Sequence, residues 1–138
     1  MVLTSATAII LLGGILGANF AHAQLPAAQH YNQIEYVSGG IGIDESTAFK
    51  DAMSQFPLAL TFAEKYGHTA AYVSDVPVVI RNKKGDTILK TNTNGPYLLV
   101  KLPAGSYKVS ATYNDKTISQ TANVGTKGTT RAVFEWGQ

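Results

Sequence analysis

From residue 58 onward, the chain consists of short runs in which hydrophobic and polar residues alternate, separated by turn residues. Leu58, Leu60 and Phe62 share one face of such a run, and Tyr107 and Val109 share one face of another. A period of two is typical of strands that bury one face. The pattern predicts strands at residues 58–62, 70–73, 76–80, 87–91, 116–124 and 130–136, and two more within residues 95–113.

Residues 95–109 predict a β-hairpin with its turn at residues 102–105. Pro103 sets φ at the second turn position, and Gly105 is well tolerated at the fourth. Short strands with turn signals between them are typical of a β-sandwich. No helical pattern lies between these strands to carry a parallel crossover, so we expect antiparallel pairing. The sequence therefore predicts a mainly β protein, an antiparallel β-sandwich.

The period changes in residues 45–56, where apolar residues recur at helical spacings. This spacing places five residues along one helix face: Ala48, Phe49, Ala52, Met53 and Phe56. Asp44 is the expected N-cap, Glu45 in the first turn favours the helix dipole, and Pro57 ends the helix. We expect this one N-terminal helix to pack on the sandwich.

A glycine-rich element, with Gly39, Gly40 and Gly42, precedes this helix and is the main candidate for ligand binding. Backbone N–H groups at the start of a helix can bind an anion, and glycines allow close approach. However, neither a G-x-G-x-x-G motif nor a P-loop lysine accompanies them, so a tight structural turn is the favoured interpretation. Asp44 and Glu45 are candidates for calcium, but two adjacent carboxylates supply too few oxygens, and helix capping explains both.

The tyrosines are expected in two environments. Tyr107 is in phase with Val109, which predicts a core position. Tyr97 follows a Gly-Pro pair at the start of a strand, and we expect it to be exposed. An aromatic ring with a polar tip suits a surface that binds sugars or peptides. Tyr97 therefore joins the glycine-rich element as a candidate ligand-binding residue.

The sequence offers little for catalysis. It contains no cysteine, no G-x-S-x-G motif and no histidine cluster with the spacing of metal ligands. His68 lies in a predicted turn, where a solvated histidine is favoured over a catalytic base, because a base needs a positioned partner. His30 lies in a polar, alanine-rich lead-in. We expect no catalytic residue, no metal and no cofactor.

The N-terminus predicts export. Residues 8–18 form an uncharged apolar run that is short for a membrane span, and an A-x-A pattern follows at residues 21–23. Cleavage after Ala23 would make Gln24 the first residue, although residues 1–7 lack Lys and Arg. An uncleaved anchor or a buried core helix is the alternative. We expect a periplasmic protein with no stable membrane insertion after cleavage.

These signals predict the domain organisation: a signal peptide at residues 1–23, a flexible lead-in at residues 24–37, and a single domain at residues 38–138. The domain would comprise the glycine-rich element with the helix, residues 38–57, and a β module at about residues 75–136. The formal net charge is +2, and the cations are scattered along the chain. Nucleic-acid binding needs a clustered basic face, so we expect no nucleic-acid partner.

Five segments carry a resemblance to a known family: DVPVVI (75–80), KGD (84–86), TNGPY (93–97), LPAGSYKV (102–109) and FEW (134–136). They resemble the carboxypeptidase regulatory-like domain, which is a transthyretin-like (prealbumin-like) β-sandwich. With the element and helix in front, the chain is similar to small periplasmic proteins of Gram-negative bacteria. Such motifs describe strands and turns, so they indicate a fold rather than a function.

The resemblance implies an exported, non-catalytic module that binds or supports another cell-envelope component, either a protein or a glycan. One alternative is a module that binds a sugar or a peptidoglycan fragment. Another is a small transthyretin-like hydrolase, although the chain ends in FEWGQ and lacks the Tyr-Arg-Gly-Ser type of ending of the related hydrolase of urate breakdown. The sequence leaves the oligomeric state open.

Overall fold

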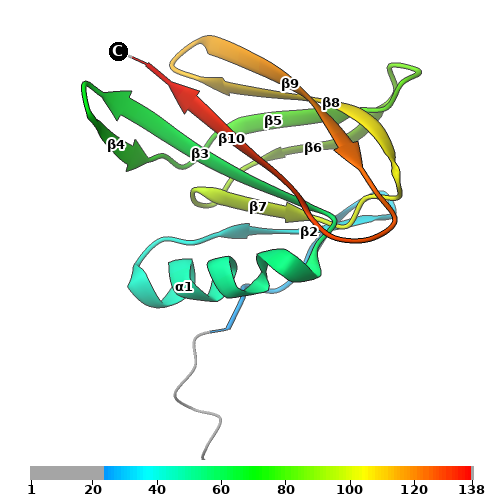
Figure 1. Cartoon of the computed structure of the whole chain (residues 1–138), viewed down its shortest axis with the longest axis horizontal. Helices are drawn as coiled ribbons and strands as arrows, with labels where there is room; N and C mark the ends of the chain where they lie inside the picture. The colour runs from blue at the N-terminus through cyan, green and yellow to red at the C-terminus, as the bar shows by residue number, and fades with distance from the viewer. Residues whose placement is uncertain (1–23, 138) are drawn as a thin grey trace, which may run out of the picture.

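The computed structural model describes residues 24–137 and shows a mainly β protein with two packed sheets and one short helix (Figure 1). The larger sheet has six strands in the order β1-β2-β7-β3-β10, with β4 also paired to β3. Its strands are β1 (Gln29–Tyr31), β2 (Ile34–Gly39), β3 (Leu58–Tyr66), β4 (Thr69–Tyr72), β7 (Tyr97–Val100) and β10 (Thr130–Trp136). The smaller sheet has the order β6-β5-β8-β9, with β5 (Pro77–Arg81), β6 (Thr87–Asn92), β8 (Gly105–Tyr113) and β9 (Lys116–Val124).

One hydrophobic core lies between the two sheets. Leu58, Leu60 and Phe62 of β3 are completely buried in it, as their alternation predicts. The ring of Phe62 stacks on that of Phe134 from β10, with 5.5 Å between the centroids. Tyr107 also belongs to this core, as expected.

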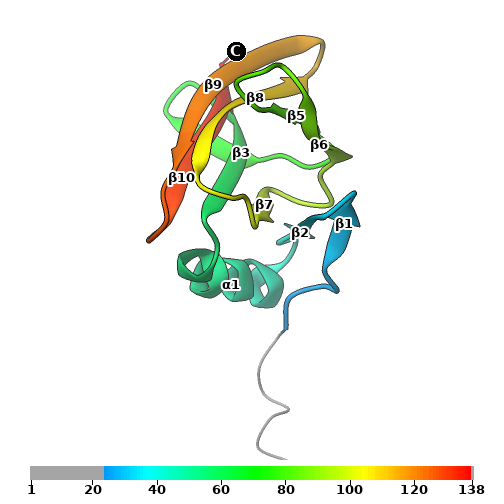
Figure 2. The same ribbon diagram turned by 90° about the vertical axis from the view of Figure 1, so that its right-hand side faces the viewer.

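A second, smaller core lies on the other face of the six-stranded sheet. Helix α1 (Ile43–Ala52) and the 3₁₀ turn η3 (Met53–Gln55) cover this face, and Figure 2 shows α1 on the side away from the four-stranded sheet. Phe49 of α1 packs here against Tyr97 and Leu99 of β7. Every residue of β7 is therefore buried, because each face of the strand meets a core.

The predicted hairpin within residues 95–109 is not formed. Strand β7 pairs with β2 and β3, whereas β8 pairs with β5 and β9 in the other sheet. Residues 101–104 thus carry the chain between sheets instead of making a two-stranded turn. The physical reason is burial. The residues of β7 are apolar on both faces, so the strand is most stable in the middle of a sheet that is covered on both faces.

Antiparallel pairing is the rule, but β10 runs parallel to β3, with Thr130 opposite Leu58 and Trp136 opposite Glu64. The pairing of the described strands is therefore mainly antiparallel, as expected, with this parallel pair as the exception. The argument that all pairs should be antiparallel assumed that only a helix could carry the chain between parallel strands. Here the intervening strands, most of them in the second sheet, serve as the crossover.

The N-terminal boundaries also differ from the expectation. Residues 24–37, expected as a flexible lead-in, include β1 and most of β2, which pair with each other. Helix α1 begins at Ile43, two residues before the predicted start, and its last turn tightens into η3 before Pro57. The predicted signal peptide and Ala23 lie outside the described residues, whereas Gln24 is exposed. In residues 24–137, no helix has the length and apolar character of a membrane span.

Candidate functional site

The glycine-rich element is closed by a hydrogen bond of its own. The Gly40 N–H donates to Oε1 of Glu45 at 2.7 Å. Gly42, with φ of 89°, occupies the N-cap position of α1, and no side chain of residues 24–137 caps the helix. Asp44 lies exposed in the first turn, so its expected role as N-cap is wrong. Glu45, the third helical residue, instead reaches back to the preceding backbone, as the acid of a capping box does.

This bond changes the chemistry expected of the element. The Gly40 N–H already has a carboxylate partner, and that carboxylate would repel a second anion. A side chain on Gly40 would place its Cβ 2.3 Å from Cδ2 of Tyr97, and one on Gly95 would meet the Gly39 carbonyl oxygen at 2.3 Å. Gly40 and Gly95 are therefore needed for close packing, Gly40 against the Tyr97 ring of β7 and Gly95 against the backbone of Gly39.

Tyr97 is buried, with 1% of its surface exposed, so the expectation of an exposed ring is wrong. Its ring stacks on Phe49 with 5.8 Å between centroids and meets Tyr72 at 5.7 Å. The hydroxyl has no hydrogen-bond partner of good geometry in the described part of the chain. Burial, together with the neighbouring Tyr72 hydroxyl, raises the pKa of Tyr97 to about 12.

A hollow of about 410 Å³ lies beside this buried ring. Residues 40–43 and Ser46 form one wall, and residues 72–74 with Pro96 form the other. Three large hydrophobic side chains at its rim are exposed: Ile41 (66%), Ile43 (83%) and Tyr72 (60%). Exposed apolar side chains gathered around a hollow make it a candidate interaction site. The hollow thus unites the predicted element with β4, which the sequence did not connect to it.

Strand β4 borders the hollow and has one unpaired edge. All four of its residues are exposed, and β3 is its only partner among the strands of residues 24–137. The Val73 N–H donates to the Phe62 carbonyl oxygen, so Val73 faces β3. The alternation of an antiparallel ladder then turns the backbone groups of Ala70 and Tyr72 away from β3. Figure 1 shows β4 at the margin of the molecule.

A buried carboxylate forms a second cluster that sequence reasoning missed. Glu64, 6% exposed, accepts hydrogen bonds from the hydroxyls of Tyr66 and, at 3.4 Å, Tyr113. The bond to Glu64 and burial raise the pKa of Tyr66, and burial is the main cause of the raised pKa of Tyr113. Glu64 and Trp136 line an adjacent hollow of about 190 Å³. The signal was present, since Glu64 continues the buried phase of Leu58, Leu60 and Phe62.

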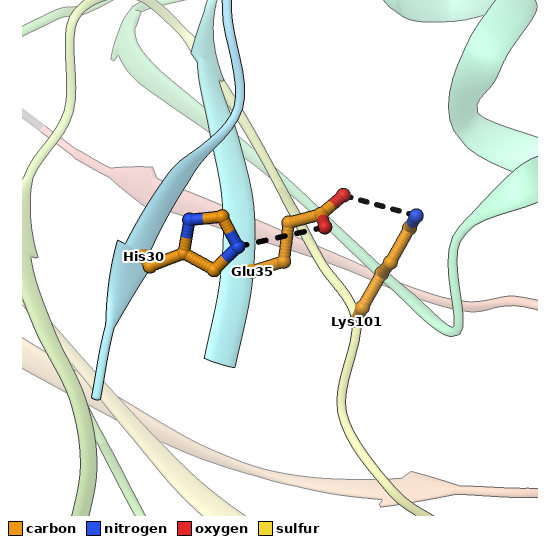
Figure 3. Close-up of polar contacts among 3 residues, drawn as sticks. All are labelled: His30, Glu35 and Lys101. Carbon is orange, nitrogen blue, oxygen red and sulfur yellow. Dashed lines mark ion pairs between the residues drawn. The ribbon is translucent and has the colours of Figure 1, made fainter. Parts of the chain in front are cut away.

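A third polar cluster joins β1, β2 and the loop after β7 (Figure 3). Glu35 lies between Lys101 and His30: its Oε2 is 3.0 Å from Nζ of Lys101, and its Oε1 is 3.7 Å from Nε2 of His30. The hydrogen bond and charge of Lys101 lower the pKa of Glu35, with a smaller contribution from His30. Lys101 Nζ also lies 5.6 Å from the centre of the Phe56 ring. The cluster is partly exposed and links β1, β2 and the loop after β7 through their side chains.

His68 is exposed in the β3–β4 turn and makes no hydrogen bond or ion pair with any residue from 24 to 137. Within the same range, no three His, Cys, Asp or Glu side chains gather as a group that could hold a metal ion. The apolar hollow beside the unpaired edge of β4 is a candidate binding site of a different kind, because exposed hydrophobic side chains lie at its rim. No protein-family model matches the chain, and no curated protein matches it.

Proposed function

We propose that the chain is a non-catalytic binding module of the bacterial cell envelope, and that it binds an extended segment of another envelope protein beside β4. The observation that carries this proposal is the unpaired edge of β4 next to exposed Ile41, Ile43 and Tyr72. An extended peptide added to a free sheet edge gains main-chain hydrogen bonds, and side-chain pockets give specificity. Here the unpaired edge of β4 offers the main-chain hydrogen bonds, and the hollow offers the side-chain pocket.

The topology defines where such a segment would lie. Strands β7 and β4 pair with the same edge of β3, β7 with its first half and β4 with its second. A strand added to β4 would therefore continue the track of β2, which pairs with β7. The chain itself leaves that track at Gly40, whose φ is 104°, and turns into α1. The space beyond the turn is the hollow.

The exposed aromatic rings favour a protein over a flat sugar platform. Tyr66 and Tyr72 are the two exposed aromatic side chains in residues 24–137. Tyr66 shares its phase with Phe62, whereas Tyr72 lies opposite Ala63. Successive residues of a strand point to opposite faces, so the two rings belong to opposite faces of the β3–β4 hairpin. They do not form one stacking surface.

Export and the finer fold type are part of the same proposal. The apolar run at 8–18 and the A-x-A pattern support a periplasmic location after cleavage at Ala23. The two packed sheets and the turn motifs of residues 75–136 support a transthyretin-like sandwich of the carboxypeptidase regulatory-like type. A hydrolase is less well supported, because His68 has no positioned partner in the described range.

A peptide selection tests the strand-addition proposal. The purified chain would be screened against displayed random octapeptides, and the selected peptides would be synthesised and their Kd measured. We expect β-branched and aromatic residues at alternate positions and no proline, as in a strand. Ala70→Pro should abolish binding, because it removes an outward N–H without removing a bond to β3.

Two variants complete the test. Ala70→Val keeps the N–H and should bind like the unsubstituted chain. Ile43→Asp should weaken binding, because it places a charge at the apolar rim of the hollow. Thermal melts would confirm that all three variants are folded. Equal Kd values for Ala70→Pro and Ala70→Val would refute strand addition at β4.

A further inference from the structure

The outer face of the four-stranded sheet carries a second, chemically different hollow of about 500 Å³. Arg81 of β5, Lys108 of β8 and Lys83 of the β5–β6 turn contribute cations to its lining. The remaining lining is mostly hydroxyl and amide groups, including Ser106, Ser119 and Thr121, and no carboxylate from the described residues lines it. The sequence shows scattered cations, and the fold brings three of them together.

The cations in this groove lack counter-charges. Arg81 and Lys108 lie directly opposite each other in the β5–β8 ladder. Like charges in opposed positions destabilise a sheet. None of the three cations forms an ion pair with a residue from 24 to 137. A bound anion would therefore relieve repulsion that is already present in the unliganded groove.

The β5–β6 turn that carries Lys83 is ordered by its own hydrogen bonds. Asn82 Oδ1 accepts from the backbone N–H groups of Lys84, at 2.9 Å, and Asp86, at 3.0 Å. Asp86 lines a neighbouring hollow, and its Oδ2 lies 3.4 Å from Nδ2 of Asn82. The turn thus holds the backbone of Lys83 in place at the end of the groove, and Lys83 makes no ion pair with Asp86.

We propose that this groove binds a saccharide that carries carboxylate groups. The cations match the charge, and a guanidinium such as that of Arg81 can bind a carboxylate through two parallel hydrogen bonds. The hydroxyl and amide side chains beside them match the hydroxyl groups of a sugar. This site goes beyond the protein-binding function proposed above, because it lies on the sheet that does not contain β4.

Titration of the full chain with two tetrasaccharides, one charged and one neutral, tests the proposal. Tetragalacturonate is the charged probe, and maltotetraose is the neutral probe of equal length. We expect calorimetric binding of tetragalacturonate, weakening as NaCl is raised from 50 to 500 mM because salt screens exposed charges, and no binding of maltotetraose. The double substitution Arg81→Gln/Lys108→Gln should weaken binding by about tenfold or more, because it removes charge-assisted hydrogen bonds.

Lys50→Gln is a matched control, because Lys50 is a cation of α1, the helix that covers the six-stranded sheet. It should change the Kd for tetragalacturonate by less than about twofold, as expected for a distant surface charge. Thermal melts would show that the variants fold. Three results would overturn the proposal: no binding of tetragalacturonate, equal binding of both saccharides, or equal losses in the double variant and Lys50→Gln. Binding to vesicles of anionic phospholipid without binding to the saccharide would replace it with a membrane-surface role.

Discussion

The hydroxyl of Tyr107 donates a hydrogen bond of 2.7 Å to the carbonyl oxygen of Pro103. Pro103 lies in the loop that leaves β7 in one sheet, and Tyr107 lies in β8 in the other. The tyrosine ring is buried between the sheets, and burial raises its pKa. One side chain therefore contributes both to the core and to the position of the crossing loop.

Two substitutions at Tyr107 separate these contributions. Tyr107→Ala should lower the free energy of unfolding by about 3 kcal/mol or more, because it leaves a cavity in the core. Tyr107→Phe keeps the ring and should cost about 1 kcal/mol through loss of the bond to Pro103. Urea denaturation would measure both. If Tyr107→Ala unfolds at the urea concentration of the unsubstituted chain, the assignment of Tyr107 to the core is wrong.

Substitutions at Gly40 and Gly42 separate two reasons for a glycine: lack of space for a Cβ and a positive φ. Both have positive φ, but a Cβ on Gly40 would collide with Tyr97, whereas a Cβ on Gly42 would meet nothing within 4 Å. Gly40→Ala should therefore be more destabilising than Gly42→Ala by about 1 kcal/mol or more, as for an overpacked core. Thermal melts of the two variants provide the comparison, and equal melting temperatures would contradict it.

At the start of α1, Glu45 should contribute more stability than Asp44. Glu45→Ala removes the acceptor of the Gly40 N–H and should cost about 1 kcal/mol or more. Asp44→Ala removes only a favourable interaction with the helix dipole and should lower the free energy of unfolding by about 0.5 kcal/mol. Denaturant titrations of the two variants, with Glu45→Gln as the variant that keeps an acceptor oxygen, would test this order. A larger loss for Asp44→Ala would restore its role as the cap.

Stability should depend on the ionisation of Glu35. Its pKa in the folded chain is below 4.5, so its contribution to stability is present above the unfolded pKa and is lost as pH falls through the folded value. Glu35→Gln should therefore reduce the loss of stability as pH falls below the ordinary pKa of a glutamate and through the lowered pKa of the folded chain. NMR titration of the carboxyl group should give a midpoint below 4.5 that rises in Lys101→Ala. An unchanged midpoint would exclude Lys101 as the cause.

Local sequence patterns predicted the positions of most strands. They did not predict which strands pair, because pairing depends on contacts between distant segments. The strands at 116–124 and 130–136 have the predicted bounds, because alternation and turn residues are local signals. The partner of β7 depends on a second core, which becomes visible only when α1 is placed on the sheet. The same core buries Tyr97, so a ring expected at the surface lies inside.

The candidate site was predicted in part. The glycine-rich element does line the apolar hollow, but β4 forms the opposite wall, and no sequence signal joins the two. Glu64 was detectable in principle, since an acid in phase with three buried residues is unusual. The groove of Arg81, Lys83 and Lys108 depends on the register of β5 and β8, which composition does not reveal.

The parallel pairing of β3 with β10 has a consequence for the order in which the chain acquires its structure. The partner of Leu58 is Thr130, close to the C-terminus, and Phe62 is stacked on Phe134. Because the N-terminus is synthesised first, the six-stranded sheet cannot be completed until β10 has left the ribosome. Such distant contacts slow folding, because loop closure must precede the stabilising contact. Until then one side of β3 is an open, apolar edge, and the chain is vulnerable to aggregation during this interval.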